Sequence, residues 1–422
     1  MWGDAPRGDV RPAGPPFRAV PEIDVLVIGA GPAGSATAAL LARQGYSVVA
    51  VDRAAFPRDK ACSEYLSPEA VRVLDRLGVV ADLERAGARP LAGTVVHGPR
   101  GARLHGLFAE ASPPPFRPRG MSVSRRVLDH RLVLAAREAG AEVLERSPLE
   151  ELLRLEDGSV GGAVVRATEG RRTIRARLTV GADGLRSTVA RRLGGRRRGP
   201  LRRVAFVAHL TSLPGLGDSA EMHVSGAGYV GLNAVGPDLV NVALVVPADA
   251  AARARGRARE FFFEALRSFP RVRPRVDPRR LVRPVMVTGP FDVRARRVVT
   301  DGALLVGDAA DFFDPFTGEG VCSALRGAEL VAEHGGAALA HGGPVTAGRL
   351  AGYRAARRRS FAGKWAVERL IGYAMAWPAL FDRAVRRLGA RPDMAHTLIG
   401  VTGDFVPARA VLDPRFLLRM VL

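Results

Sequence analysis

The sequence predicts an α/β fold in which a parallel-sheet domain carries an inserted, mostly antiparallel β-sheet domain and a C-terminal helical segment. Three observations predict it. A strand–turn–helix–strand pattern occupies residues 23–52, strand patterns recur through 201–296, and helical patterns fill the chain after Gly320. At 422 residues, the chain is also too long for one typical hydrophobic core, which favours two domains.

The first pattern is that of a βαβ unit. It begins with an apolar strand (Val25–Ile28) and a G-x-G-x-x-G turn (Gly29/Gly31/Gly34). An Ala- and Leu-rich helix (Ser35–Arg43), a second strand (Ser47–Val51) and an acid (Asp52) follow. In such units the glycines permit a tight turn, a close approach to pyrophosphate and close helix–strand packing. The helix N-terminus attracts phosphate and the acid binds a ribose. The unit therefore predicts a dinucleotide site, without deciding between NAD and FAD.

The remaining elements follow from periodicity and from capping residues. In the first half of the chain, the patterns predict a helix capped by Ser67, a helix and a strand over 122–145, and a β-meander over 149–180. Four strands over 202–248 and a helix over Glu260–Phe269 come next. Strands over Leu281–Val287 and Ala303–Val306 and a long helix from about Val321 complete the series. We therefore expect a nucleotide-binding domain formed by 22–88, 120–200 and 297–345, a β-sheet substrate domain formed by 89–119 and 201–296, and a helical region over 346–422. Residues 1–21 are expected to be a disordered tail.

The formal net charge of +21 comes almost wholly from arginine, because Lys60 and Lys364 are the only lysines. Such a charge can indicate nucleic acid or an anionic membrane. The arginines are scattered through an Ala-, Gly- and Pro-rich chain and are not interleaved with aromatic residues. We therefore expect no nucleic-acid binding, and an acidic cofactor or an anionic membrane surface explains the charge better.

Cys62 and Cys322 are the only cysteines, which excludes a disulfide framework and a structural zinc site, and no metal site is expected. Residues 1–20 lack the apolar core of a signal peptide, and no run of 18 apolar residues suits a transmembrane helix. We expect a cytoplasmic protein, with the inner membrane surface as an additional location. The oligomeric state is left open.

Four later stretches combine polar residues and glycines in ways that are typical of sites. They are the loop Arg58–Leu66, G-A-D-G-L-R-S at 181–187, G-D-A-A at 307–310 and P-F-T-G-E-G at 315–320. Each motif at 181–187 and 307–310 follows a predicted strand, and the last stretch opens a predicted helix. The loop at 58–66 is a candidate site loop, with a solvated connector as the alternative.

Together with G-A-G-P-A-G at 29–34, these motifs resemble the superfamily of FAD-dependent aromatic hydroxylases and geranylgeranyl reductases, from about Ile23 to His341. The loop D-K-A-C-S-E-Y-L-S-P at 59–68 is most similar to the geranylgeranyl-reductase-like members. The resemblance implies a Rossmann-like FAD-binding domain of the GR2 type, with FAD as resident cofactor and NAD(P)H as transient reductant.

The resemblance also implies individual roles. Asp52 would hold the adenosine ribose, Arg125 would lie near the phosphate or ribityl chain, and Asp308 would hold the ribityl hydroxyls. The turn Gly318–Gly320 would direct N–H groups at the N1–C2=O edge of the flavin, where reduced flavin carries negative charge. The full set implied for cofactor binding is Gly29, Gly31, Pro32, Ala33, Gly34, Asp52, Arg53, Cys62, Arg125, Leu149, Asp183, Gly184, Gly307, Asp308, Gly318, Glu319 and Gly320.

The resemblance implies an FAD-dependent oxidoreductase that reduces or hydroxylates a hydrophobic isoprenoid, lipid or polyketide-like substrate. Candidate catalytic groups are Cys62, Glu64 and Tyr229, each with a structural role as the alternative. Two departures leave the substrate open: the aromatic substrate-sheet stretch of the reductases reads Y-V-G-L-N-A at 229–234, and the usual C-G reads Cys62-Ser63.

Two alternatives remain. One is an aromatic monooxygenase proper, and the other is a non-catalytic prenyl or lipid escort on the same fold. The intact glycine turn Gly29/Gly31/Gly34 and the acids Asp52, Asp183 and Asp308 favour an FAD enzyme over the escort. An apolar pocket is expected between the second sheet and the flavin.

One apolar stretch has two interpretations. Aromatic and aliphatic residues crowd the segment 365–381, which includes two tryptophans. Packing in the core is the default expectation for such residues. An amphipathic surface for a membrane or a greasy substrate is the alternative.

Overall fold

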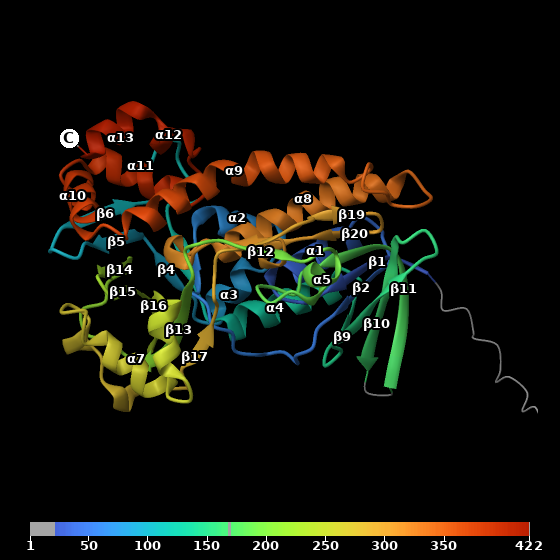
Figure 1. Cartoon of the computed structure of the whole chain (residues 1–422), viewed down its shortest axis with the longest axis horizontal. Helices are drawn as coiled ribbons and strands as arrows, with labels where there is room; N and C mark the ends of the chain where they lie inside the picture. The colour runs from blue at the N-terminus through green and yellow to red at the C-terminus, as the bar shows by residue number, and fades with distance from the viewer. Residues whose placement is uncertain (1–21, 168–169, 422) are drawn as a thin grey trace, which may run out of the picture.

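The computed structural model describes residues 22–167 and 170–421, so the predicted tail at 1–21 lies outside the described residues. Figure 1 shows the N-terminal sheet on the right, the second sheet with its yellow strands on the lower left, and the red C-terminal helices on the upper left. The predicted α/β fold, with an inserted sheet and a C-terminal helical region, is confirmed. The expected domain boundaries stay a prediction.

The first sheet contains the predicted βαβ unit. Its strands, in spatial order, are β19 (Val299–Thr300), β20 (Ala303–Leu305), β11 (Gly170–Gly181), β1 (Ile23–Ile28), β2 (Val48–Val51) and β8 (Glu142–Leu144). β1 is parallel to both β2 and β11, and Val25 pairs with Val48 and with Leu178. β9 (Leu149–Arg154) and β10 (Val160–Ala167) extend from β11 as an antiparallel meander. The carboxyl ends of β1, β11 and β20 therefore meet at one edge, where ligands bind in such sheets.

Helices cover this sheet and form its core. They are α1 (Pro32–Ala42), α2 (Pro68–Arg76), α3 (Val80–Arg85), α4 (Arg125–Glu138), α5 (Thr188–Arg192) and α8 (Gly320–Ala340). α1 packs against α4 and α8, and its Ala-rich sequence permits these close contacts. α1 begins at Pro32, earlier than the helical composition predicts, because proline suits the first helical position. Ser67 caps α2 as predicted.

The second sheet is mostly antiparallel. Its strands, in spatial order, are β17 (Met286–Thr288), β13 (Arg203–Thr211), β16 (Leu239–Pro247), β15 (Gly228–Ala234), β14 (Ala220–Ser225), β5 (Gly93–His97) and β6 (Arg103–Leu107). Only β14 and β5 pair in parallel. α6 (Ala248–Ala251) and α7 (Ala258–Leu266) cover one face, α6 through Ala250 and Ala251 and α7 through Phe261 and Phe262. The other face is turned toward the FAD-type motifs.

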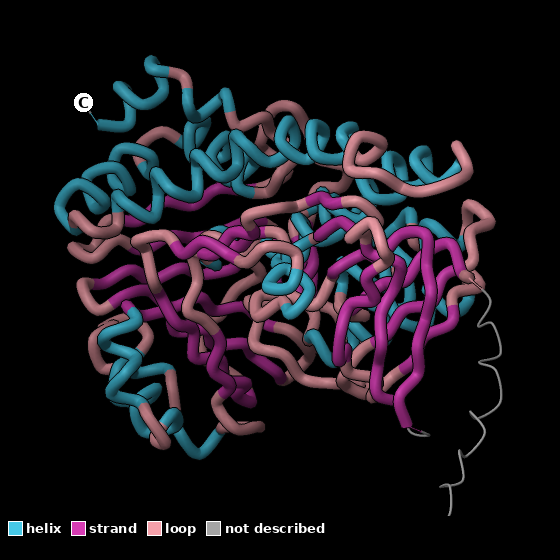
Figure 2. The backbone as a smooth tube through the Cα atoms, turned by 45° about the vertical axis from the view of Figure 1, so that its right-hand side comes forward, coloured by secondary structure: helices cyan, strands magenta, loops and turns pink. Residues whose placement is uncertain are grey.

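Six short strands form two further three-stranded sheets. They are β3 (Tyr65–Leu66), β4 (Arg89–Leu91) and β7 (Gly120–Ser122) in one group, and β12 (Arg196–Arg198), β18 (Val293–Ala295) and β21 (Asp311–Phe312) in another. Figure 2 shows the strands as magenta groups with the long C-terminal helices running above them.

The predicted strand over Leu281–Val287 is wrong for most of its length. Leu281 forms one isolated bridge with Leu210, and regular pairing begins only at β17. Pro284 lies between them. Proline has no backbone N–H to donate to a neighbouring strand, so it interrupts the pairing on this sheet edge.

The C-terminal region is helical, as predicted. Its helices are α9 (Ala351–Ala374), α10 (Pro378–Gly389), α11 (Pro392–Thr402), α12 (Arg409–Leu412) and α13 (Pro414–Val421). α9 packs along α8, while α10 and α11 pack on β6 of the second sheet. Within residues 22–167 and 170–421, no helix is both long and apolar enough to cross a membrane.

The default expectation that the stretch 365–381 packs in the core is wrong for part of it. Phe381 is buried, but Leu370, Tyr373, Trp377 and Leu380 are exposed. The cause is that α9 and α10 cover the molecule as an outer layer, so only one side of each helix meets the core.

Candidate functional site

The glycine turn after β1 is shaped for close backbone contact. Gly29 has a φ of +102°, which favours glycine. A Cβ on Gly34 would overlap the Gly29 carbonyl oxygen. A Cβ on Gly31 would instead face the guanidinium groups of Arg58 and Arg125, 3.7 and 3.8 Å away. Gly31 therefore leaves room for an anionic group at the N-terminus of α1, beside two positive charges.

Asp52, the acid after β2, holds this turn in place through hydrogen bonds. Oδ2 of Asp52 accepts a hydrogen bond from the Ala30 N–H, and Oδ1 accepts one from the Ala54 N–H, both at 2.8 Å. Asp52 is buried, whereas Arg53 beside it is exposed. Leu149 begins β9 and is half-buried, and neither Arg53 nor Leu149 lines the main cavity. Their roles in cofactor binding stay predictions.

A cluster of cations faces the open glycine. Arg125 is buried and donates two hydrogen bonds to Asp129, at 2.6 and 2.7 Å, and Arg58 lies 3.1 Å from the same carboxylate. Burial opposes the charge of Arg125, but the attraction of Asp129 outweighs it and raises the pKa of the guanidinium. Burial, together with Arg125, lowers the pKa of Lys60. The three cations outnumber the two acids near them, Asp129 and Asp308, so the cluster suits an anion such as pyrophosphate.

The second and third motifs meet this cluster. Asp183 caps α5 through its Oδ2, which accepts the Thr188 N–H at 2.6 Å, while its Oδ1 is buried with no hydrogen-bond partner among the described residues. A Cβ on Gly184 would lie 3.4 Å from Nζ of Lys60. Asp308 lines the cavity, and burial raises its pKa although Lys60 and other cations oppose this. The Asp308 carboxyl is therefore placed to accept ligand hydroxyls, whereas Asp183 does not itself line the cavity, and its role in cofactor binding stays a prediction.

The loop before α8 closes the far side of the site. Gly318 has a φ of +76°, and its carbonyl accepts a hydrogen bond from the Ser63 hydroxyl at 3.3 Å. α8 begins at Gly320, so its unbonded N–H groups lie at the cavity wall beside Thr317 and Val321. This is the placement that the motif predicts for the flavin-facing turn, and the role itself stays a prediction.

Glu319 contributes to this turn only through its backbone. Its side chain is buried away from the cavity, where Oε2 accepts a hydrogen bond from the Ser67 hydroxyl at 3.1 Å and Oε1 has no partner among the described residues. Burial raises the pKa of Glu319 to about 8, which the charge of Lys364 only partly offsets. Burial therefore favours the protonated form of this carboxyl.

This raised pKa predicts a pH-dependent stability. A carboxyl with a pKa of about 8 in the folded protein and 4.5 in the unfolded chain stabilises the fold below pH 4.5, and this contribution is lost as the pH rises through 8. Glu319→Gln keeps the shape of the protonated acid and cannot ionise. We expect the thermal midpoint of the variant to rise relative to wild type between pH 5.5 and pH 9. The exposed Glu84→Gln is the matched control, and an equal offset at both pH values for Glu319→Gln would contradict the assignment.

Cys62 lies where the sequence predicts, in the wall of the cavity. Its carbonyl and that of Ser63 accept hydrogen bonds from Nδ2 of Asn241, at 3.1 and 2.9 Å. Oδ1 of Asn241 is buried and has no partner among the described residues. Asn241 is thus a candidate ligand-binding group that the sequence analysis missed, because a single asparagine within a strand pattern carries no motif.

The position of Glu64 does not fit a catalytic role at the cavity. Its carboxylate is buried, accepts the Arg125 N–H at 2.8 Å, and lies 2.6 Å from Nε2 of His209. It does not line the cavity. Its geometry is that of a residue that positions Arg125 and ties the second sheet to the cofactor loop.

Tyr229 presents its ring to the cavity and its hydroxyl to a buried carboxylate. The hydroxyl donates to Oδ1 of Asp314 at 2.6 Å, and Arg203 lies 2.7 Å from the other oxygen. Burial, reinforced by Asp314, raises the pKa of the phenol well above its usual range. Tyr229 is therefore a protonated, immobilised wall residue, and a direct catalytic role stays a prediction.

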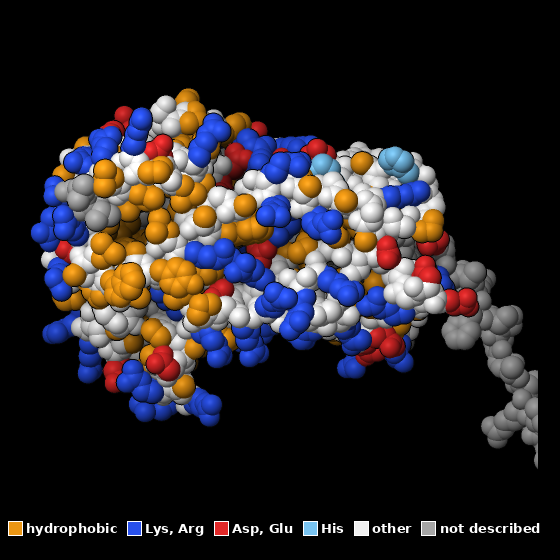
Figure 3. Space-filling model, turned by 45° about the horizontal axis from the view of Figure 1, so that its top comes forward, with side chains coloured by type: hydrophobic (Ala, Val, Ile, Leu, Met, Phe, Trp, Pro, Cys, Tyr) orange, Lys and Arg blue, Asp and Glu red, His pale blue; other side chains and the backbone are white. Residues whose placement is uncertain are grey.

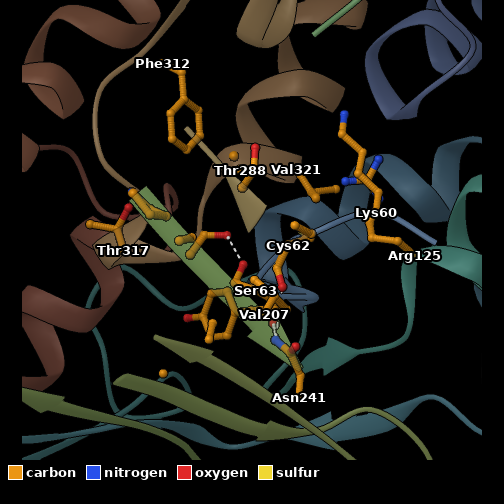
Figure 4. A pocket seen from close by; sticks show the side chains of 18 of the residues that line it. Lys60, Cys62, Ser63, Arg125, Val207, Asn241, Thr288, Phe312, Thr317 and Val321 are labelled. Atoms are coloured by element: carbon orange, nitrogen blue, oxygen red, sulfur yellow. Dashed lines mark hydrogen bonds between the residues drawn. The ribbon is translucent and has the colours of Figure 1, made fainter. Parts of the chain in front are cut away.

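One cavity is lined by Lys60, Cys62, Arg125, Tyr229, Asn241 and Asp308, and Figure 4 shows Lys60 and Arg125 together at one end and Asn241 and Val207 on the sheet at the other. The sheet end is largely apolar, as the sequence predicts. Its lining there includes Ala205, Val207, Ala220, Met222, Ala243, Val245, Phe291, Phe312 and Phe316. The cavity thus combines an anion-binding end with an apolar end.

Comparison with known proteins gives concordant results. A family model described as FAD binding domain matches residues 22–364. The chain is similar to a menaquinone reductase of Mycobacterium tuberculosis strain ATCC 25618 / H37Rv, with 31% identity over 345 residues, covering 74% of this chain and 76% of the relative. It is also similar to digeranylgeranylglycerophospholipid reductase 2 of Methanothermobacter thermautotrophicus, with 30% identity over 338 residues, covering 76% and 79%.

Among solved structures, the myxobacterial chondrochloren halogenase CndH, an FAD-dependent halogenase, superposes with a TM-score of 0.78. The match covers 94% of this chain and 92% of the halogenase at 23% identity. At that identity the similarity shows the fold alone.

Proposed function

The chain belongs to the FAD-binding-domain family and is an FAD-dependent oxidoreductase, and from this premise we propose that it uses NAD(P)H as reductant and reduces a hydrophobic, isoprenoid-type substrate. Bound FAD supplies the hydride chemistry, and the protein supplies binding, orientation and exclusion of water. The observation that carries the proposal is the continuous cavity with its cationic end and its apolar end.

The residues present fit FAD. Gly31 leaves space beside Arg58 and Arg125 for the pyrophosphate, and the Asp308 carboxyl in the cavity wall suits hydroxyl groups. The N-terminus of α8 suits the flavin edge that becomes negative on reduction. This arrangement favours an FAD enzyme over the non-catalytic prenyl escort.

Two considerations favour reduction of a lipid-soluble substrate over hydroxylation. The two relatives described above, at 31% and 30% identity, are both named as reductases, one of a quinone and one of a geranylgeranyl lipid. Small, aliphatic and aromatic side chains make up most of the sheet end of the cavity, which suits a long apolar chain, and Thr94, Glu221, Asn233, Asn241 and Thr288 add hydrogen-bonding groups at particular points. We propose that the protein acts in the cytoplasm, at the inner surface of the membrane that holds such substrates.

A cavity-filling substitution tests where the substrate binds. Ala243 pairs with Gly231 and Val207 across the sheet, and all three line the apolar end. We expect Ala243→Phe to lower kcat/KM for a polyprenyl substrate roughly tenfold or more while FAD content and NAD(P)H-driven flavin bleaching are unchanged. Ala252→Phe, at an exposed site, is the matched control. Unchanged kcat/KM in Ala243→Phe would show that the substrate binds elsewhere.

A further inference from the structure

The C-terminal helices carry most of the exposed apolar surface among the described residues. Of nine exposed large hydrophobic side chains, five lie there: Leu370, Tyr373, Trp377, Leu380 and Leu418. Trp377 is 66% exposed, the highest value of the nine. Burial of tryptophan is strongly favoured in water, so a tryptophan left this exposed next to other apolar groups indicates a surface that meets something else.

Four of these residues lie on either side of the junction between α9 and α10. Leu370 and Tyr373 lie three residues apart on the last turns of α9, Trp377 is at the junction, and Leu380 is in the first turn of α10. Helical neighbours at this spacing share a side. We call this set, Leu370, Tyr373, Trp377 and Leu380, the α9–α10 face. Figure 3 shows hydrophobic side chains gathered around a hollow on the left of the molecule, with Lys and Arg side chains around them.

The opposite side of the same segment contacts the cavity wall. Ile371, Ala374 and Met375 pack against the buried core cluster that includes the cavity residues Tyr229 and Phe291. The rings of Phe316 and Phe381 lie 6.2 Å apart, edge to face. The α9–α10 segment therefore separates the apolar end of the cavity from the exposed face by the thickness of one helix layer.

The charge around the α9–α10 face has one sign. Residues 369–391 contain five arginines and one acid, Asp382. Asp382 is buried and accepts hydrogen bonds from the backbone of Arg100 and from Arg386. Arg383 and Arg387 are exposed, follow Leu380 by three and seven residues, and form no ion pair among the described residues. An apolar face bordered by unpaired cations is complementary to an anionic lipid headgroup layer.

We propose that the α9–α10 face docks on an anionic lipid bilayer, with Trp377 and Leu380 in the headgroup–acyl boundary and Arg383 and Arg387 on lipid phosphates. The docking brings the apolar end of the cavity next to the bilayer, so a lipophilic substrate passes between them without crossing bulk water. Only the passage of substrate from the bilayer to the cavity rests on the proposed function. The docking itself does not depend on catalysis.

Vesicle sedimentation of the FAD-loaded, full-length protein tests the docking without any substrate. We expect binding to phosphatidylcholine vesicles that contain phosphatidylglycerol and about tenfold weaker binding to phosphatidylcholine alone. Trp377→Ser/Leu380→Ser and Arg383→Glu/Arg387→Glu are each expected to weaken binding to the anionic vesicles about tenfold or more. The matched controls are Phe116→Ser, at an aromatic residue of similar exposure, and Arg280→Glu, at an exposed arginine, both distant in sequence. Flavin absorbance and thermal midpoint verify that every variant is folded.

Absence of binding by the yellow wild-type protein, or equal loss in the controls and the face variants, would overturn the docking. A wild-type dimer that Trp377→Ser/Leu380→Ser dissociates, in a protein that ignores vesicles, would also overturn it and assign the face to a second copy of the chain. Because flavin content is measured in the same samples, a failure of docking is distinct from a failure of the proposed function, which concerns turnover.

Discussion

Gly34→Ala is expected to yield a protein without FAD and with markedly reduced stability. The added Cβ would overlap the Gly29 carbonyl oxygen and would lie 3.2 Å from the Cβ of Ala182. The clash is with backbone, so relief requires α1 to move away from β1. Overpacking of this kind costs about 1–3 kcal/mol, and it also moves the helix N-terminus that faces the pyrophosphate. FAD per protein by absorbance and the thermal midpoint are the measurements.

Gly217→Ala is the matched control for this change. A Cβ there has no atom within 4 Å, and its backbone conformation is open to any residue. The control is expected to retain wild-type flavin content and melting temperature. Full FAD occupancy in Gly34→Ala would show that the turn does not form the cofactor site.

Asp308→Ala is expected to weaken FAD binding roughly 10- to 100-fold, because a hydrogen bond to a charged group contributes about 1.5–3 kcal/mol. Asp308 lies at the carboxyl end of β20, in the cavity wall and within the field of Lys60, Arg125 and Arg196. Removing its carboxyl takes away the acceptor for ligand hydroxyls and leaves the surrounding cations less balanced. Titration of the apoprotein with FAD, followed by flavin fluorescence, measures the change.

Asp308→Asn separates the two effects. It keeps an oxygen acceptor and removes the charge, so we expect an affinity between those of wild type and Asp308→Ala. If Asp308→Ala binds FAD as tightly as wild type, the third motif does not contact the cofactor, and the site would have to be redrawn around Asp183.

The sequence predicts the fold well where the information is local. The βαβ unit is recognisable because its glycines, helix and acid occur within 30 residues in a fixed order, and the second sheet is recognisable from strand patterns over 202–248. The strand Leu281–Val287 is the exception. Its apolar residues match the pattern, but Pro284 interrupts the backbone pairing on which a strand depends.

The site is predictable at the level of motifs and less so at the level of side chains. The sequence places Glu319 in the flavin-facing turn, but it does not show that the carboxyl turns toward Ser67 and away from the cavity. It also cannot show that Glu64 meets His209, because the two residues are 145 positions apart and are joined only by the docking of the second sheet. Such pairs depend on tertiary contacts that no local pattern records.

The C-terminal helices show the same limit. Aromatic residues at helical spacing indicate a core-facing stripe by default, and Phe381 follows that rule. Trp377 is exposed instead. Whether an apolar residue of a helix is buried depends on which other elements pack against that side of the helix. That information resides in the packing of α9 and α10 over the cavity wall.

The most direct test of the central claim is turnover in the absence of oxygen. The purified, FAD-loaded protein is incubated anaerobically with NAD(P)H and either a polyprenyl quinone or a geranylgeranyl glycerophospholipid, and the products are analysed by mass spectrometry. The account predicts a product that has gained hydrogen only, and loss of this product in Ala243→Phe. A product that forms only with O₂ and carries an oxygen atom from ¹⁸O₂ would contradict the assignment as a reductase and identify the protein as a hydroxylase.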